Sequence, residues 1–505
     1  MEIDLAKLDS SATGSDLLRA NICIVGGGIA GLTLAHKLVT LGHEVLLLEA
    51  GGHQLAAFAP VEQTGRPHPG TSEPRLRALG GTSLTWGGQL LPFPQDSSWP
   101  VSAADIARFT PEVEQLLAVD SLPYDVPEFF THTHQPAPVL LSQIPQLNAS
   151  LSKFAPFSHR NLAQSLGRKL RTDSKARIIL RAHVTELILA PTLDRIEALL
   201  VRGASGRTFR IEANHIVLAA GTIETVRLLL GSRIGNEHDQ VGRNFHDHLT
   251  VTAATLREPA RTQLLATFRP WIYQRTLHSL KLSSSPDLRR QLHLTPILTH
   301  LIIDEPEDSG IGALRSLLRA RQQNNVTPAL RETLPHLPRA LTDATRLMLS
   351  ARTQHRRYVS PRATVQLRLN AAQSTPSASR ITLSPDLQLI LDWRIDSTEL
   401  ATLRAFAQHL RTHLNFDGID WNPLLFTSDP SAPIPDLDDA RHAMGGATMG
   451  TDPHTSVVDP NLGVHGLRNL FIASAAIFPD GSPQFPTLPL MCLTLRLAQH
   501  LHRQL

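Results

Sequence analysis

Cysteine is scarce in this sequence of 505 residues, which contains only Cys23 and Cys492. Both lie within apolar runs, so we expect two buried thiols and either a reducing compartment or no disulfide role. The sequence also lacks the C-x-x-C, H-E-x-x-H and G-x-S-x-G motifs. Without these motifs, the sequence gives no support for a zinc enzyme or a serine hydrolase that depends on them.

Long apolar runs and a strong charge excess are missing too. No stretch of about 18 apolar residues occurs, so we predict no transmembrane segment. Residues 1–20 carry four acidic residues and lack a basic stretch followed by an apolar core, which argues against a signal peptide. The net charge of +3 gives no reason to expect nucleic-acid binding. We therefore expect a cytoplasmic protein without a nucleic-acid partner.

The most informative stretch lies near the start, where an apolar run leads into Gly26, Gly28 and Gly31 in a G-x-G-x-x-G pattern. This pattern predicts a strand, a tight turn, a helix that begins near Ile29, and a second strand that ends at Glu49. The first glycine permits the turn, the second lets a pyrophosphate approach the backbone, and the third lets the helix pack closely on the strand. Free N–H groups at the start of the helix would face the phosphates.

The acidic residue at the end of the second strand narrows the choice of dinucleotide. A carboxylate at Glu49 can accept hydrogen bonds from a ribose diol, which favours FAD or NAD over NADP. Ala30 and Ala50 adjoin these groups and belong to the predicted nucleotide site. A glycine-rich turn with a purely structural role is the alternative.

Two later segments are also rich in small residues. Residues 80–88 are dense in glycine and hydroxyl groups, and such a backbone can press against a flat or charged ligand, although an ordinary loop is the alternative. Residues 215–230 are predicted to form an apolar strand, a turn at Ala220 and Gly221, and a helix. A fully apolar strand is typical of a parallel sheet that is buried on both faces.

Several other elements are predicted from local patterns. We expect a helix over 103–117 with Ser102 as its N-cap, strands over 288–304 and 362–370, and a hairpin that turns around Ser384. These parts alternate along the chain, so we expect two domains that interleave in sequence.

Two further predictions concern the first residues and an arginine-rich segment. Residues 1–20 are expected to form an irregular lead. Residues 311–357 combine arginines with apolar residues at helical spacing, which predicts an amphipathic lid that faces solvent. A contact with a membrane surface or a partner is the alternative.

Three segments resemble the glucose-methanol-choline (GMC) oxidoreductases, a family of FAD enzymes that dehydrogenate alcohols. The first two are the glycine turn and residues 80–88, and the second of these is most similar to members related to pyranose 2-oxidase and glucose-fructose dehydrogenase. The third and most specific segment begins with His442-Ala-Met-Gly-Gly-Ala-Thr-Met-Gly450 and continues through 456–460, 464–474 and 477–488. The resemblance covers the whole chain except roughly 255–360.

The resemblance implies an α/β fold with a doubly wound, Rossmann-like FAD-binding domain and an interleaved substrate domain, built on an antiparallel sheet with covering helices. It divides the chain into a lead (1–20), a discontinuous FAD-binding domain (21–250), a mainly substrate-binding domain (251–435) and a C-terminal return to the FAD-binding domain (436–505). By resemblance, FAD would be held by Gly26, Gly28, Ile29, Ala30, Gly31, Glu49, Ala50, Gly80, Gly81, Thr82, Ser83, Trp86, Gly87, Gly88, Val184, Ala220, Gly221, Ser474, Ala475, Phe485, Pro486 and Thr487.

The resemblance also assigns the chemistry. Oxidation of an alcohol removes a hydride from carbon, which the flavin N5 accepts, and a proton from oxygen, for which imidazole is a suitable base near pH 7. His442 stands at the first catalytic position of the family and would be this base. The helix that starts near Pro486 and Thr487 would direct its positive dipole end at the flavin.

Three positions depart from the family pattern. The second catalytic position, usually His or Asn, is Phe485, which can neither donate nor accept a hydrogen bond, and Gln484 beside it is the candidate replacement. Thr85 stands where pyranose 2-oxidase has a flavin-linking histidine, so we predict non-covalent FAD. Ser474 replaces a common Asp near the flavin tail, where its hydroxyl can still form a hydrogen bond.

One further pattern is discounted. His246, Asp247 and His248 have the spacing of metal ligands, but they fall within a Gly-Arg-Asn-x-x-Asp-His loop that the family shares. We therefore predict no metal site.

Three functions remain open at this stage. The first is an FAD-dependent oxidoreductase that takes a hydride from the CH–OH group of a small, hydrophobic or secondary-metabolite substrate and passes electrons to oxygen, a quinone or another acceptor. The second is a flavin-dependent tailoring enzyme that desaturates, cyclises or isomerises its substrate, which Phe485 favours. The third is a flavin-binding protein without catalysis. The oligomeric state stays open.

Overall fold

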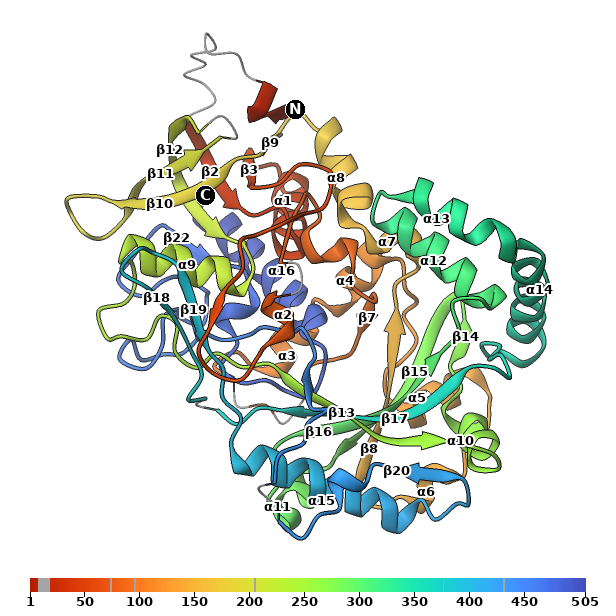
Figure 1. The fold of residues 1–505 in the computed structure, drawn as a ribbon. Helices are drawn as coiled ribbons and strands as arrows, with labels where there is room; N and C mark the ends of the chain where they lie inside the picture. The colour runs from red at the N-terminus through yellow and green to blue at the C-terminus, as the bar shows by residue number, and fades with distance from the viewer. Residues whose placement is uncertain are drawn as a thin grey trace.

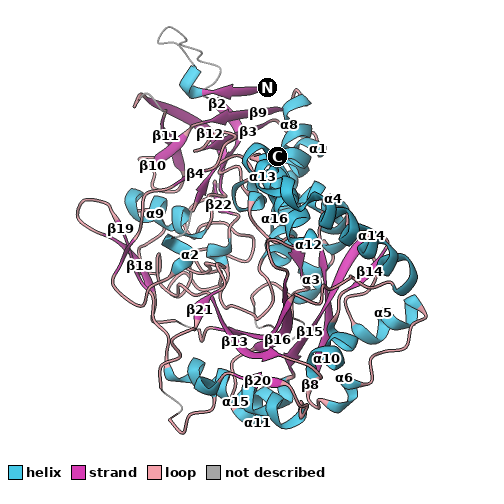
Figure 2. Cartoon of the chain, turned by 45° about the vertical axis from the view of Figure 1, so that its right-hand side comes forward, coloured by secondary structure: helices cyan, strands magenta, loops and turns pink. Residues whose placement is uncertain are grey.

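The computed structural model describes residues 1–7, 19–72, 75–94, 97, 99–203, 206–375, 377–429 and 432–505. Two sheets dominate the structure, one in the upper part and one in the lower part of Figure 1. Figure 2 shows their strands in magenta, with helices placed around both sheets. The predicted α/β fold class is confirmed.

The upper sheet has eight strands and a parallel centre. In order across the sheet they are β1 (Glu2–Asp4), β9 (Ala176–Leu180), β3 (Val45–Glu49), β2 (Arg19–Val25), β12 (Thr208–Leu218), β11 (Ile196–Arg202) and β10 (His183–Leu189), and β22 (Leu470–Ile472) pairs with β12. Because β2, β3, β12 and β22 run parallel, their carboxyl ends meet at one edge of the sheet. The glycine turn lies at this edge.

Helices cover the upper sheet. The helix after the glycine turn, α1 (Ile29–Thr40), packs against α8 (Leu162–Thr172) and the C-terminal α16 (Thr487–Gln504), and α9 (Thr222–Ser232) follows β12. Every side chain of β3 is buried, as expected for a strand covered on both faces. Cys23 on β2 and Cys492 on α16 are both buried and form no disulfide.

The lower sheet has nine strands, all paired in antiparallel fashion. Their order is β20 (Ile419–Trp421), β13 (His248–Leu256), β17 (Thr364–Ala372), β16 (Ile297–Asp304), β15 (Thr276–Ser284), β8 (Leu147–Phe154) and β7 (Gln89–Leu90), with β14 (Trp271–Tyr273) beside β15 and β21 (Asp438–Asp439) beside β13. β7 and β8 precede several strands of the upper sheet in the chain, so the two sheets interleave in sequence.

The remaining elements connect and cover the two sheets. The helices are α2 (Pro69–Ser72), α3 (Ala103–Ala107), α4 (Thr110–Leu117), α5 (Val126–Thr133), α6 (Leu140–Gln143), α7 (Phe157–Arg160), α10 (Ala260–Phe268), α11 (Pro286–Leu292), α12 (Gly310–Gln322), α13 (Val326–Thr333), α14 (Leu337–Gln354) and α15 (Ser397–His413). The short strands are β4 (Ala56–Ala57), β5 (Glu62–Gln63), β6 (Leu76–Arg77), β18 (Arg380–Leu383) and β19 (Leu389–Asp392).

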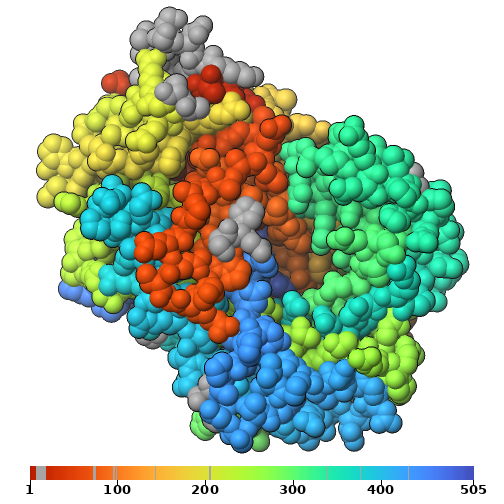
Figure 3. Space-filling model, viewed as in Figure 1, coloured from red at the N-terminus to blue at the C-terminus, as the bar shows by residue number. Residues whose placement is uncertain are grey.

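The arginine-rich segment forms an outer layer on one side of the molecule. It folds into α12, α13 and α14, which lie at the right-hand edge of Figure 1, and large apolar side chains such as Leu341 and Leu349 on α14 are exposed. The surface in Figure 3 is hollowed between this green layer and the orange N-terminal segment. Across the described parts of the chain, no helix combines the length and the apolar character needed to cross a membrane.

Local predictions met mixed outcomes. The Ser102 cap, the hairpin of β18 and β19, and the helices within 311–357 are confirmed. The single helix over 103–117 is wrong, because Pro111 lacks an N–H and a second helix starts beside it. The strand over 288–304 is also wrong in its first half, where Ser285 caps α11.

The expected irregular lead is wrong for its first residues, because β1 pairs with β9. Residues 8–18 of that lead lie outside the described residues.

Candidate active site

The glycine turn joins β2 to α1 with little space around it, except at one position. Gly26 has φ +106°, and a Cβ there would lie 2.5 Å from the Ala219 oxygen. A Cβ on Gly31 would lie 1.9 Å from the Gly26 oxygen, so this glycine lets α1 approach the strand. A Cβ on Gly28, in contrast, would meet no atom within 4 Å. The backbone at Gly28 is therefore open to a ligand.

Glu49 lies at the end of β3 and supports the turn. Its Oε2 accepts a hydrogen bond of 2.8 Å from the Gly27 amide, and its Oε1 accepts one of 2.7 Å from the Gly51 amide, next to Ala50. Each carboxylate oxygen keeps acceptor capacity for another donor. Burial raises the pKa of Glu49, and the two backbone donors oppose this shift.

Residues 80–88 contact the same turn. The Gly80 amide donates to the Gly27 oxygen at 2.8 Å, and a Cβ on Gly81 would lie 2.9 Å from the Gly28 Cα. Thr82 and Ser83 continue from there in a short 3-10 helix. Ser83 Oγ accepts from the Leu162 amide, so the segment is anchored to α8.

The rest of this segment packs on Arg160. Trp86 Nε1 donates to the Arg160 oxygen at 2.9 Å, and a Cβ on Gly88 would lie 2.7 Å from Arg160 Nε. Gly87, between them, is open, because a Cβ there would meet nothing within 4 Å.

Five other predicted positions lie on the upper sheet or beside it. Gly221 caps α9 with φ +78° and open space beside it, and the preceding Ala220 would touch a Cβ on Gly26. Val184 lies on β10, and its oxygen accepts from Arg227 at 3.3 Å. Ser474 follows β22, where its Oγ accepts from the Ala476 amide, and the oxygen of Ala475 accepts from Gly445.

These residues fit a dinucleotide. A Cβ on Gly28 or on Gly221 would meet no atom within 4 Å. Each of these glycines follows a strand of the parallel pair β2 and β12, at the carboxyl edge of the upper sheet. The N-cap of α1 has no side-chain hydrogen bond, so amides of its first turn are available to a phosphate. This chain can therefore hold the ADP half of FAD at this edge.

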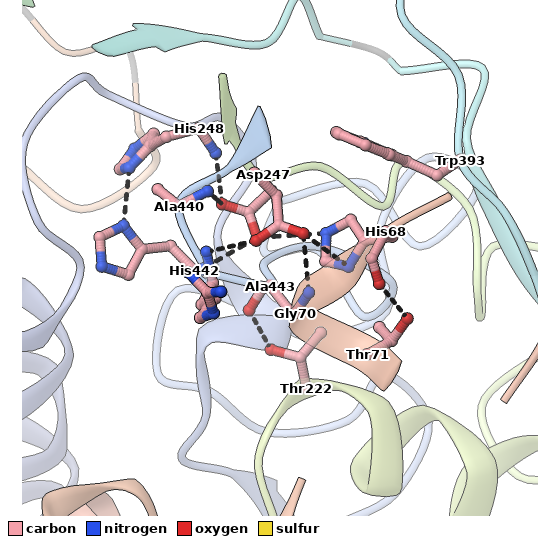
Figure 4. A network of polar contacts seen from close by, with 12 residues as sticks. His68, Gly70, Thr71, Thr222, Asp247, His248, Trp393, Ala440, His442 and Ala443 are labelled. Atoms are coloured by element: carbon pink, nitrogen blue, oxygen red, sulfur yellow. Dashed lines mark hydrogen bonds and ion pairs between the residues drawn. The ribbon is translucent and has the colours of Figure 1, made fainter. Parts of the chain in front are cut away.

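A second group of side chains surrounds His442, close to the start of α16. His248 Nε2 lies 2.5 Å from the Ser482 oxygen, and His248 Nδ1 lies 2.9 Å from His442 Nδ1 (Figure 4). Burial and the neighbouring His442 lower the pKa of His248 to about 3, so His248 is neutral near pH 7. Burial also lowers the pKa of His442, against the attraction of Asp247.

These contacts fix the tautomer of both rings. A carbonyl oxygen can only accept, so His248 must carry its hydrogen on Nε2. The Nδ1 of a neutral His248 is then an acceptor, and His442 must donate to it from Nδ1. The Nε2 of His442 is left with a lone pair and has no hydrogen-bond partner among the described residues.

Asp247 holds both histidines by their backbones. Its Oδ1 accepts from the His248 amide at 2.6 Å, and its Oδ2 accepts from the His442 amide at 2.8 Å. His68 Nε2 lies 3.2 Å from the same Oδ2, and His68 Nδ1 lies 3.5 Å from Asp439 Oδ2. All of these side chains except His442 are fully or almost fully buried.

The charges in this network stabilise one another. Burial alone would lower the pKa of His68, but Asp247 and Asp439 raise it overall. Burial alone would raise the pKa of Asp247, but His68 lowers it. The three side chains have the types and spacing of metal ligands, yet each ring nitrogen of His68 already faces a carboxylate. The contacts of His68 with the two carboxylates account for this arrangement.

Phe485 and Gln484 lie on different sides of the chain. The Phe485 ring packs edge-on to His442, with 5.6 Å between ring centroids. Gln484 lines a cavity of about 1320 Å³, and its buried Oε1 has no hydrogen-bond partner. Pro486 and Thr487 follow at the start of α16, whose N-cap carries no side-chain hydrogen bond.

Sequence reasoning missed the supporting residues around His442. It noticed Asp247 and His248 only as a discounted metal motif, and it did not single out His68 at all. Their contacts join positions far apart in the chain, 179 residues in the case of His68 and Asp247 (247 − 68). The available signal was the loop His246-Asp247-His248, in which a carboxylate stands between two imidazoles.

Comparison with known proteins agrees with this geometry. Models of the GMC oxidoreductase family match residues 165–250 and 375–494, and a model of NAD(P)-binding Rossmann-like domains matches residues 24–68. The gluconate 2-dehydrogenase flavoprotein of Pantoea cypripedii is 26% identical over 141 residues, which cover 27% of this chain. That alignment spans 22% of the length of the relative.

A solved structure has the same overall fold. Pyridoxine 4-oxidase from Mesorbium loti superposes with a TM-score of 0.60 and 18% sequence identity, over 96% of this chain and 99% of the other. The two GMC models match the segments that carry Gly221, His248 and His442, and the Rossmann-like model matches the segment that carries Gly28. The chain therefore belongs to the GMC oxidoreductase family, with FAD as its cofactor.

Proposed function

We propose that this protein oxidises the CH–OH group of a small molecule, with non-covalent FAD and with His442 as the base. The observation that carries the proposal is the hydrogen-bond chain from the Ser482 oxygen through His248 to His442. It leaves the Nε2 lone pair of His442 ready to accept a proton. A base of this kind is what alcohol oxidation requires.

Residues of this chain accept the hydroxyl proton and stabilise the resulting charge. FAD, when bound, supplies the acceptor for the hydride at N5. His442 takes the hydroxyl proton at Nε2, while its Nδ1–H stays bonded to His248. The positive charge that His442 gains is stabilised by Asp247, which attracts it through the buried network.

The predicted cofactor residues complete this proposal. The open backbone at Gly28 would receive the pyrophosphate, Glu49 the ribose, and Val184 the adenine. The amides at the start of α16, after Phe485, would face the flavin and favour negative charge there. We assign the upper sheet to FAD binding and the lower sheet to the substrate.

A second candidate function is kept for one reason. Phe485 offers no hydrogen bond at the position beside His442, so a second donor to an alkoxide is missing there. Removing such a donor costs on the order of 3 kcal/mol of transition-state stabilisation in enzymes that use one. A flavin-dependent desaturation, cyclisation or isomerisation would not need this donor.

Anaerobic mixing distinguishes the two candidates. The FAD-loaded protein is mixed with a panel of alcohols and a panel of apolar compounds without a hydroxyl group, and the loss of flavin absorbance is followed. We expect loss with an alcohol and a decrease in its rate of about 10²–10⁴-fold in His442→Ala. His248→Phe should show a smaller decrease, because it removes only the partner that sets the tautomer of His442.

Other outcomes contradict the proposal in different ways. Loss of absorbance only with compounds that lack a hydroxyl group supports the tailoring enzyme. No loss with either panel, in a protein that holds FAD tightly, supports flavin binding without catalysis.

A further inference from the structure

Lys281 on β15 is a buried cation without a partner. Its side chain is 2% exposed, and it forms no hydrogen bond or ion pair with any described residue. Its Nζ lies 5.4 Å from the centroid of the Phe485 ring. The same ring packs against His442, so Lys281 lies close to the proposed base.

Two further basic side chains extend this position across the sheet. Leu282 pairs with Thr299, so the next step of the register places Lys281 opposite His300 on β16. His300 is paired with Arg368 on β17. Residues directly opposite each other in antiparallel strands point to the same face, so the three side chains form one row, which we call the cationic row.

No carboxylate balances this row. Among the described residues, Lys281, His300 and Arg368 have no ion pair, and Nδ1 of His300 and Nε of Arg368 are buried without a hydrogen-bond partner. The one side-chain hydrogen bond of the row to a described residue runs from Arg368 to Thr252, at 3.3 Å. Unpaired buried charges and donors are costly, and proteins rarely keep them without a use.

The titration behaviour agrees with this lack of partners. Burial lowers the pKa of Lys281 to about 7. Burial, Lys281 and Arg368 lower the pKa of His300 well below its usual range. All three groups would gain from a negative charge placed among them.

A cavity reaches this face of the sheet from outside. Ser150, the cross-strand partner of Lys281, and Ser283, the next residue of β15 on the same face, both line the cavity of about 1320 Å³ that Gln484 also lines. The cavity therefore adjoins the strand positions beside Lys281, and Gln484 places it next to Phe485 in the chain.

We propose that the cationic row binds a carboxylate of the substrate, so that the protein oxidises an alcohol that also carries an acid group. Neighbouring strands are about 5 Å apart, so an anion above His300 is within reach of both long side chains beside it. Because the hydroxyl must reach His442, the two groups lie at opposite ends of a small molecule. This substrate class rests on the proposed alcohol oxidation.

Binding of benzoate tests the site without catalysis. The FAD-loaded protein is titrated by calorimetry with benzoate and with benzamide, which has the same shape and no charge. We expect benzoate to bind at least about tenfold more tightly, and Lys281→Met to abolish this preference. Lys169→Met, a change of the same kind at an exposed lysine of α8, should leave the preference unchanged.

Three results would overturn the site. These are equal binding of the two probes, no binding of either, or a benzoate preference that persists in Lys281→Met. Thermal unfolding of Lys281→Met is measured in parallel, and a folded variant with unchanged Tm shows that the lost preference is not a loss of structure. Arg368→Met should weaken benzoate binding as well, which keeps the test valid if Lys281→Met does not fold.

Activity then separates this proposal from the proposed function. 4-(Hydroxymethyl)benzoate and its amide are compared as reductants of the flavin. A benzoate preference without reduction by any alcohol retains the anion site and contradicts alcohol oxidation. Flavin reduction that depends on His442, together with equal binding of the two probes, retains alcohol oxidation and contradicts the anion site.

Discussion

Two buried lysines on neighbouring strands have opposite surroundings. Lys153 on β8 bonds Glu114 Oε1 at 2.5 Å and the Asp120 oxygen at 2.8 Å, and Asp120 also contacts His278. Lys281 on β15 is equally buried and has none of these partners. Lys153 pairs with His278, and Lys281 pairs with Ser150, so the two lysines point to opposite faces of the same sheet.

The difference shows how one sheet serves two purposes. On the face of Lys153, each charge has a partner within the protein, and the cluster ties α4 to the sheet. On the face of Lys281, the cationic row has no acidic partner among the described residues and lies beside a cavity. Breaking a buried pair is strongly destabilising, whereas removing a lone buried charge removes a cost. We therefore expect Lys153→Met to lower the stability of the protein. We expect Lys281→Met to weaken anion binding without lowering stability.

The largest expected effect is on stability. Lys153→Met should lower the free energy of unfolding by about 3–5 kcal/mol, because it leaves Glu114 and Asp120 buried without their cation. Lys281→Met should leave the free energy unchanged or raise it. Urea unfolding of both variants measures this, and an equal loss in the two would remove the distinction between them.

The second effect appears in the pH dependence of stability. The pKa of Lys281 is about 7 in the folded protein, below the 10.5 of an unperturbed lysine. Between these values the unfolded chain binds the extra proton, so the free energy of unfolding gains about 1.4 kcal/mol per pH unit from this group. The titratable groups that share this face with Lys281 on β16 and β17 are His300 and Arg368, and neither is an acid.

The measurement is the difference between wild type and Lys281→Met in urea unfolding at several pH values. This difference should rise in favour of the wild type from pH 7 to about pH 10. A difference that does not change with pH would mean that Lys281 has a partner in the folded protein.

The smallest effect is expected at a third lysine. Lys37 on α1 bonds Glu112 at 2.8 Å, but both side chains are partly exposed. Lys37→Met should therefore cost only about 0.2–1 kcal/mol in urea unfolding, because solvent screens such a pair. A loss as large as that of Lys153→Met would show that pairing matters more than burial, and would weaken the comparison.

The sequence predicted the parts of the fold that short motifs encode. Gly26, Gly28 and Gly31 carry their geometry within six residues, and the block from His442 to Thr487 has enough specific residues to identify the family. The fold class, the family and FAD follow from these segments. Non-local contacts could not be predicted in this way.

The cationic row illustrates this limit. Lys281, His300 and Arg368 are distant in the chain and become neighbours only through the register of β15, β16 and β17. Sequence reasoning did not recognise β15 and began the next strand too early, so the row was not visible. The support of His442 by His248, Asp247 and His68 depends on tertiary contacts in the same way.

A crystal structure of the FAD-loaded protein with benzoate tests the central claim of this comparison most directly. The account predicts the carboxylate above His300, with a hydrogen bond to Nζ of Lys281, and the aromatic ring directed towards Phe485 and His442. A carboxylate bound instead at Arg289, which lines the cavity of about 1320 Å³, or a Lys281 paired with an acidic side chain of the protein, would contradict it.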